Sequence, residues 1–192
     1  MWYTLQEMYV GGYVSMDTFI EQIVVKRRTY GDVLLQTALW VFGIFLGLLI
    51  LWFAFFVVTP YFFVGIFLTG LLWYGVYRLS GFFYIEYEYS VTNGYFDIDK
   101  IVAKRSRKRL LSMECKNAES FGKYREAEHA QRSYDLRIMV PRGVEDPNNY
   151  YLTVRLPDKG HVLVVFTPDE RTLAAVRRFL PKQVVRDADS RG

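Results

Sequence analysis

The chain has 192 residues and a formal net charge of +4, and 52% of its residues are hydrophobic and 18% aromatic. Its single cysteine, Cys115, excludes an intramolecular disulfide, a cysteine-rich zinc site and a CxxC redox pair. The positive excess is too diffuse to predict nucleic-acid binding. No Asp, Glu, Lys or Arg occurs between Asp32 and Arg78, and a charge-free block of this length argues against an ordinary soluble protein.

Residues 1–32 form an N-terminal segment in which 1–15 show no clear periodicity and are expected to be loose. The stretch Asp17–Arg28 predicts a short amphipathic helix that begins at Asp17. Such a helix would lie on a membrane surface or pack on the soluble domain. Its apolar face would be formed by Met16, Phe19, Ile20, Ile23 and Val24.

Residues 33–83 predict a hairpin of two transmembrane helices. The apolar runs 33–58 and 61–77 are each near the length that crosses a bilayer core of about 30 Å, if the second extends to about residue 83. Thr59-Pro60 ends the first helix, because proline removes a backbone donor and disfavours helix in the residue before it. Basic residues favour the cytoplasmic side, so the flanks predict a multi-pass protein of the cell (plasma) membrane with both termini cytoplasmic. Those flanking residues are Lys26, Arg27, Arg28 and Arg78.

Gly43 and Gly47 form a small-xxx-small pair in the first apolar run. Such pairs let two helix backbones approach closely. The pair therefore predicts a helix-packing surface, used either against the second helix or between two copies in a homo-oligomer.

Residues 84–181 predict a cytosolic domain of about six antiparallel strands and one helix. Alternation over 85–92, followed by Asn93-Gly94, is typical of a hairpin with a type I′ turn. Further strands are expected near 95–103, 108–114, 134–140, 150–156 and 161–167. Thr167 is expected to cap a C-terminal amphipathic helix that ends at Pro181, and residues 182–192 are expected to be a disordered tail.

This order of strands followed by a helix is that of a PH-like split barrel. The stretches MDTFIEQIVVKRR and IEYEYSVTNGYFDIDKIVAKRSRKRLLSMEC, separated by the two apolar helices, resemble a family of small bacterial two-helix membrane proteins classed as a domain of unknown function. The resemblance runs from Met16 to Cys115 and more weakly to the C-terminal helix. It implies a membrane location and a PH-like C-terminal domain, supplies no catalytic residues, and makes residues 1–15 look like an extension.

Six basic residues surround the turn between the expected second and third strands. They are candidates for binding anionic lipid head groups, and a solvated hairpin that protects a sheet edge is the alternative. A lipid-binding loop of PH domains usually lies between the first two strands, where this chain has only Asn93-Gly94. The six residues are Lys100, Lys104, Arg105, Arg107, Lys108 and Arg109.

Four acidic residues on one face of the first hairpin could hold a hard cation or pair with the basic strand beside them; we favour pairing. These are Glu86, Glu88, Asp97 and Asp99. The two histidines, His129 and His161, are far apart in sequence, and no nucleophile or phosphate-loop motif accompanies them. We therefore expect no catalytic residues, no metal and no cofactor.

The sequence thus predicts a non-catalytic, membrane-anchored interaction module rather than an enzyme. Its cytosolic PH-like domain would face an unidentified protein partner or an anionic lipid surface. The alternative is an accessory subunit of a membrane channel or transport complex.

Overall fold

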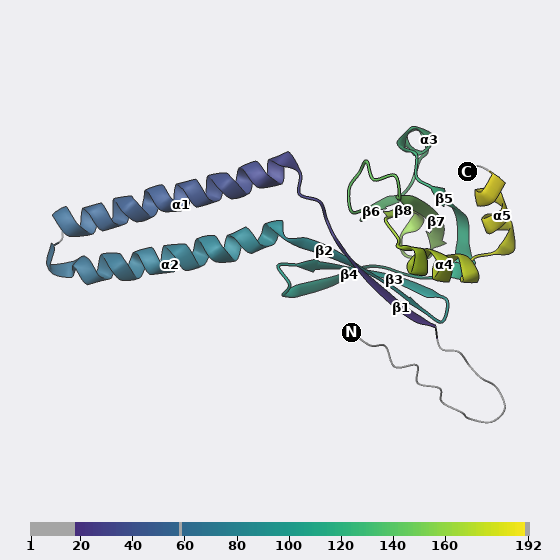
Figure 1. Ribbon diagram of the computed structural model, residues 1–192, viewed down its shortest axis with the longest axis horizontal. Coiled ribbons are helices and arrows are strands. Elements are labelled where there is room, and N and C mark those ends of the chain that lie inside the picture. Colours follow the sequence, from purple (N-terminus) through teal and green to yellow (C-terminus); the bar gives the residue numbers. More distant parts are fainter. Residues whose placement is uncertain (1–17, 58, 191–192) are drawn as a thin grey trace, which may run out of the picture. The chain divides into compact units, whose positions relative to one another are not determined.

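The computed structural model describes residues 18–57 and 59–190, so expectations for residues 1–15 lie outside the described part (Figure 1). The chain divides into two compact units. The hairpin unit comprises residues 25–87 and 100–108. The described part of the sheet unit comprises 18–24, 88–99 and 109–190.

Two long helices dominate the hairpin unit, as the sequence predicts. Helix α1 (Tyr30–Phe56) begins after a capping box in which the Thr29 backbone N–H donates to Asp32 Oδ2 at 3.1 Å. A 3₁₀ turn, η1 (Thr59–Tyr61), separates it from α2 (Phe62–Ser80), which confirms the break at Thr59-Pro60. By length and composition both helices could cross a membrane.

Glycines bring α1 and α2 together. A methyl group on Gly43 would lie 2.9 Å from Val76 Cγ2, and one on Gly47 would lie 3.5 Å from Thr69 Cγ2. The fit is tightest at Gly65, where an added Cβ would stand 2.3 Å from Ala54 Cβ. Gly43 and Gly47 therefore pack against the second helix of the same chain.

The first sheet has the strand order β1-β2-β3-β4. Its members are β1 (Phe19–Val25), β2 (Ile85–Thr92), β3 (Tyr95–Val102) and β4 (Ser106–Glu114). The helix predicted over Asp17–Arg28 is wrong, since Phe19–Val25 form β1; its expected first residue, Asp17, and Met16 lie outside the described residues. The β1 run FIEQIVV is rich in β-branched residues and too short to hold a helix alone, and β2 supplies the partner for its backbone groups.

The second sheet has the order β5-β7-β8-β6. It contains β5 (Ala118–Lys123), β6 (Leu136–Met139), β7 (Tyr150–Leu156) and β8 (Gly160–Phe166). The described part of 84–181 holds seven strands where about six antiparallel ones are predicted, β6 runs parallel to β8, and β1 adds a strand from before the hairpin. Strand β5 and the short helix α3 (Glu126–Ala130) lie in a polar stretch whose period gives no signal.

A short 3₁₀ turn, η3 (Cys115–Asn117), connects β4 to β5. Two helices, α4 and α5, follow the last strand, β8. Helix α4 (Glu170–Phe179) is capped by Asp169, which accepts from the Thr172 backbone N–H at 2.7 Å, and not by Thr167 as predicted. Residues 182–190 form helix α5 and not a disordered tail. Pro181 starts this helix by accepting from the Val185 backbone N–H, and Val184 is buried beneath it.

The core of the sheet unit lies between its two sheets. The rings of Tyr89, Phe96 and Phe166 pack together, with centroids 5.1 Å apart for Phe96 and Phe166 and 5.7 Å for Tyr89 and Phe166. The buried Tyr89 hydroxyl donates to the Val140 carbonyl at 2.5 Å, so a polar bond also joins the two sheets.

Candidate functional site

The charged residues of the hairpin unit lie at the open end of the hairpin, which is the end opposite the connection between α1 and α2. Nine basic residues stand against only Asp32 and Glu86, which gives this unit a formal charge of +7, while the rest of the chain carries −3. The connection between α1 and α2 contributes no charge. The basic residues lie before α1, in the last turn of α2 and around the β3–β4 turn: Lys26, Arg27, Arg28, Arg78, Lys100, Lys104, Arg105, Arg107 and Lys108.

The β3–β4 turn lies beside the end of α2. Lys104 Nζ stands 5.3 Å from the centroid of the Tyr84 ring, and the Arg105 guanidinium stands 6.0 Å from that of Tyr77. The Ala103 backbone N–H donates to the Tyr84 carbonyl at 2.9 Å. Two cations of the turn are thus held over tyrosine rings at the helix end, in cation–π geometry.

This turn has a backbone that its residues do not favour. Ala103 and Lys104 both have positive φ, 55° and 54°, which is the left-handed region that costs residues with a Cβ about 1 kcal/mol or more. The β2–β3 turn uses Asn93 and Gly94 at φ 50° and 87°, as the sequence predicts for a type I′ turn. The β3–β4 turn therefore keeps a lysine at a position that glycine would occupy with less strain.

Replacing Lys104 with glycine should raise the midpoint of thermal unfolding by a few degrees, because it relieves about 1 kcal/mol of backbone strain. Lys108→Gly removes the same charge inside strand β4 and should lower the midpoint, since glycine weakens a strand by about 0.5–1 kcal/mol. Circular dichroism of the full chain in detergent would measure both. If the thermal midpoints of the two variants shifted in the same direction, backbone strain at Lys104 would be ruled out.

Arg109 is engaged by the acidic face of the first hairpin. Its Nε donates to Asp99 Oδ1 at 3.0 Å, and its Nη1 lies 3.3 Å from Asp97 Oδ2. The hydrogen bond to Asp99 and the charge of both carboxylates raise the pKa of Arg109 above its ordinary value. Of the six predicted basic residues, Lys104 and Arg105 meet the helix end and Arg109 pairs within the sheet. Lys100 is half-buried in β3, and Arg107 and Lys108 are exposed in β4.

Two of the four predicted acidic residues, Asp97 and Asp99, pair with Arg109 of β4, as expected from the prediction that they pair with the basic strand rather than hold a cation. Glu86 instead accepts from the Tyr84 hydroxyl at 2.8 Å, and Glu88 is buried. Among the residues that the structure describes, no group of three or more His, Cys, Asp and Glu side chains is placed to hold a metal ion.

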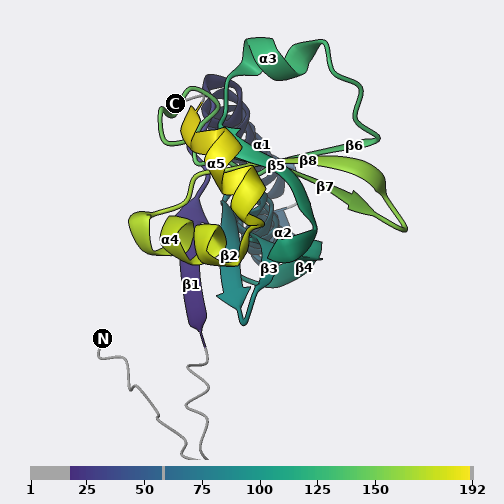
Figure 2. The same cartoon turned by 90° about the vertical axis from the view of Figure 1, so that its right-hand side faces the viewer.

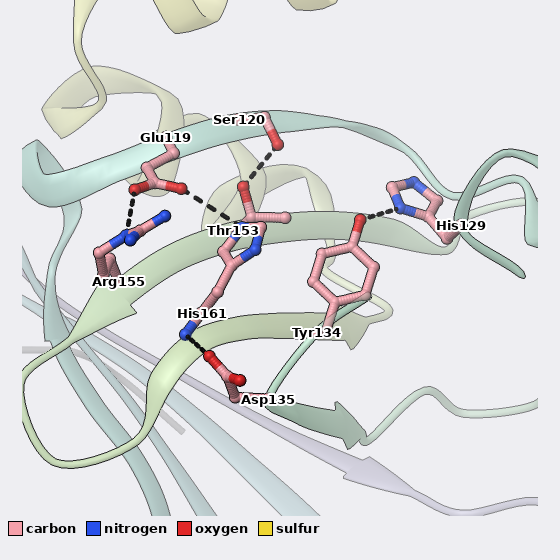
Figure 3. Close-up of polar contacts among 8 residues, drawn as sticks. All are labelled: Glu119, Ser120, His129, Tyr134, Asp135, Thr153, Arg155 and His161. Atoms are coloured by element: carbon pink, nitrogen blue, oxygen red, sulfur yellow. Dashed lines mark hydrogen bonds and ion pairs between the residues drawn. The ribbon is translucent and has the colours of Figure 1, made fainter. Parts of the chain in front are cut away.

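A second polar group lies on the β5-β7-β8-β6 sheet (Figure 3). Glu119 accepts from Arg155 Nε and faces His161 Nε2, both at 3.3 Å, and Asp135 Oδ2 accepts from the His161 backbone N–H at 2.7 Å. Beside this group, Ser120 and Thr153 share a hydrogen bond of 2.6 Å. The exposed ion pair bridges β5 and β7 and contributes little to stability.

His129 and His161 flank the same tyrosine although they are 32 residues apart in sequence. His129 Nδ1 lies 2.8 Å from the Tyr134 hydroxyl, and the His161 ring centroid lies 5.0 Å from that of Tyr134. Sequence reasoning missed this arrangement because it depends on the parallel pairing of β6 with β8.

Burial raises the pKa of the Cys115 thiol to about 11, so the thiol is protonated at neutral pH and unsuited to act as a nucleophile.

The described strands form two four-stranded sheets, and two helices follow the last strand. The chain belongs to the family described as "Bacterial PH-like domain (DUF6106)", whose model matches residues 16–186. The match extends beyond the stretch to Cys115 that carries the resemblance most clearly, and it includes α1, α2 and most of α5. No curated protein and no solved structure matches the chain.

Proposed function

We propose that this protein is a non-catalytic, membrane-anchored module whose PH-like domain contacts anionic lipid through the β3–β4 turn. Helices α1 and α2 cross the cell membrane, and the charged open end of the hairpin lies on the cytoplasmic side, as do both termini. The length of the two helices and the gathering of nine basic residues at one end of the hairpin support this arrangement.

The observation that carries the proposal is the contact of Lys104 and Arg105 with Tyr84 and Tyr77 beside the last turn of α2. Tyrosine side chains are favoured at head-group depth, and a lysine or arginine near an anionic surface contributes about 1 kcal/mol. A turn held at the end of a membrane helix brings both cations to that depth. The strained Lys104 backbone fits this role, because glycine would relax the turn but remove the cation.

The proposal predicts that anionic lipid stabilises the purified full chain. In a neutral detergent, added phosphatidylglycerol should raise the midpoint of thermal unfolding, whereas phosphatidylcholine should have much less effect. The double variant Lys104→Gln, Arg105→Gln should lose most of this shift. The matched control Lys182→Gln, Arg186→Gln removes the same charge from exposed positions of α5 and should retain it. Higher salt should weaken the response.

If both double variants lost the phosphatidylglycerol-induced shift equally, the shift would depend on net charge alone, which would contradict a specific role for the turn. Equal shifts with the two lipids would do the same. Anchoring is tested separately: a chain released from membranes by alkaline extraction would contradict the transmembrane assignment of α1 and α2.

A further inference from the structure

A groove of about 280 Å³ lies in the sheet unit near the end of β5. Strand β5 is an edge strand of its sheet, and α5 packs on it, with α4 nearby (Figure 2). This volume is just below the range of about 300–1,000 Å³ that is typical of ligand pockets, so the groove fits only a small ligand. The residues that matter for its chemistry are Phe121, Lys123, Arg125, Tyr150, Arg177 and Asp189.

One wall of the groove is aromatic. The rings of Phe121 and Tyr150 are stacked, with centroids 5.5 Å apart and planes inclined by 15°. This wall suits the flat or apolar body of a ligand.

The other lining groups are mostly cationic. Lys123, Arg125 and Arg177 face two acidic residues, of which Glu128 pairs with Arg125 at 3.3 Å. Asp189, on α5, pairs with Arg177 Nη2, on α4. Without the Asp189 carboxylate, the groove would carry two positive charges in excess.

Arg177 is only half satisfied by this ion pair. Its Nε is buried and has no hydrogen-bond partner among the described residues, while its Nη2 is bonded to one oxygen of Asp189. The Nε–Nη2 edge of a guanidinium is suited to donate two parallel hydrogen bonds to a carboxylate or phosphate. A better placed oxyanion could therefore use both donors where Asp189 uses one.

We propose that this groove binds a phosphate monoester carried on an aromatic or apolar group, and that Asp189 occupies Arg177 until the ligand displaces it. The phosphate carries a charge of about −1.5 to −2 at neutral pH, which matches the excess left when Asp189 leaves. The ring of the ligand lies along Tyr150. This site is separate from the lipid-contacting turn and does not depend on the proposed function.

Calorimetric titration of the full chain in detergent tests the proposal, with phenyl phosphate as the probe. Arg177→Gln should weaken binding about tenfold or more, because charge-assisted hydrogen bonds are lost. Asp189→Asn should strengthen binding several-fold, since it removes the competing carboxylate. The neighbouring Arg178→Gln is the matched control, because Arg178 lies over the Phe179 ring, and it should leave affinity within about twofold.

Opposite signs for the Arg177 and Asp189 variants separate displacement from simple charge attraction. Inorganic phosphate should bind more weakly than phenyl phosphate, and inositol 1-phosphate that bound more tightly would overturn the role of the aromatic wall. Arg177→Lys, which keeps the charge but loses the paired donors, replaces the glutamine variant if that one does not fold. No heat from phenyl phosphate at millimolar concentration, or unchanged affinity in Asp189→Asn, would overturn the proposal.

Discussion

Replacing Gly65 with alanine should destabilise the α1–α2 hairpin, whereas the same replacement at Gly70 should stabilise it or leave it unchanged. Both glycines lie in α2, where alanine is preferred over glycine by about 1 kcal/mol on helix propensity alone. At Gly65 the new methyl group would meet Ala54 Cβ at 2.3 Å, and overpacking of this kind costs about 1–3 kcal/mol. At Gly70 nothing lies within 4 Å of the added atom.

The double variant Gly65→Ala, Ala54→Gly offers a stricter test. It moves the methyl group from one helix to the other and should recover most of the stability lost in Gly65→Ala, which is a coupling that independent sites do not show. Thermal unfolding in detergent, followed by the helical circular dichroism signal, measures the four proteins. Additive effects of the two single changes would contradict a direct contact between these residues.

Long periodic or apolar segments were predictable from sequence alone. The break between the helices follows from Thr59-Pro60, and the Asn93-Gly94 turn has the positive φ values that its residues favour. These features depend on local chemistry, because proline ends a helix and glycine accepts a left-handed backbone wherever they occur.

Segments that depend on distant partners were not predictable. Strand β1 fits a helical period equally well, and its conformation is decided by pairing with β2, some sixty residues later in the chain. Helix α5 is short and polar, and the burial of Val184 requires β5 to be in place. Strand β5 itself interrupts a polar stretch in which apolar residues are too few to show a period.

The candidate site was predictable as a composition but not as a geometry. Six basic residues within ten mark the β3–β4 turn, yet nothing in the sequence shows that Tyr77 and Tyr84 receive two of them or that Arg109 is taken by Asp97 and Asp99. The groove at β5 carries no sequence signal at all, because its cations come from β5, the residue before α3, and α4. Sites assembled from several elements become visible only when topology has brought those elements together.

Acidification from about pH 7.5 to 5.5 should destabilise the PH-like domain through His129. This side chain is 1% exposed, its Nε2 has no partner among the described residues, and its ring is enclosed by Tyr124, Tyr134 and Tyr151. Burial lowers the pKa of His129, Arg132 and Arg137 lower it further, and Glu128 opposes them. The unfolded chain, with a histidine pKa near 6.5, therefore binds the proton more readily than the folded one.

The direction of the effect follows from this difference. Well above pH 6.5, His129 is neutral in both the folded and the unfolded chain, and protonation takes nothing from the free energy of unfolding. As the pH falls through 6.5, the unfolded chain binds the proton first, and the free energy of unfolding decreases until the pH has passed the folded-state pKa. Thermal midpoints measured in pH steps should fall in the parent chain and fall less in His129→Phe, which keeps an aromatic ring but cannot take a proton. His161→Phe is the control, because His161 is partly exposed and pairs with Glu119.

The informative quantity is the pH dependence and not the midpoint at one pH, since His129→Phe also removes the hydrogen bond to Tyr134. A phenylalanine variant with the parent's full pH dependence would show that other groups cause the acid loss. An acid loss that His161→Phe removed and His129→Phe left in place would contradict the assignment to His129. With His129 as the cause, the loss should concentrate at α3 and the start of β6, because the Arg137 side chain donates to the His129 carbonyl at 3.0 Å and ties the two elements together.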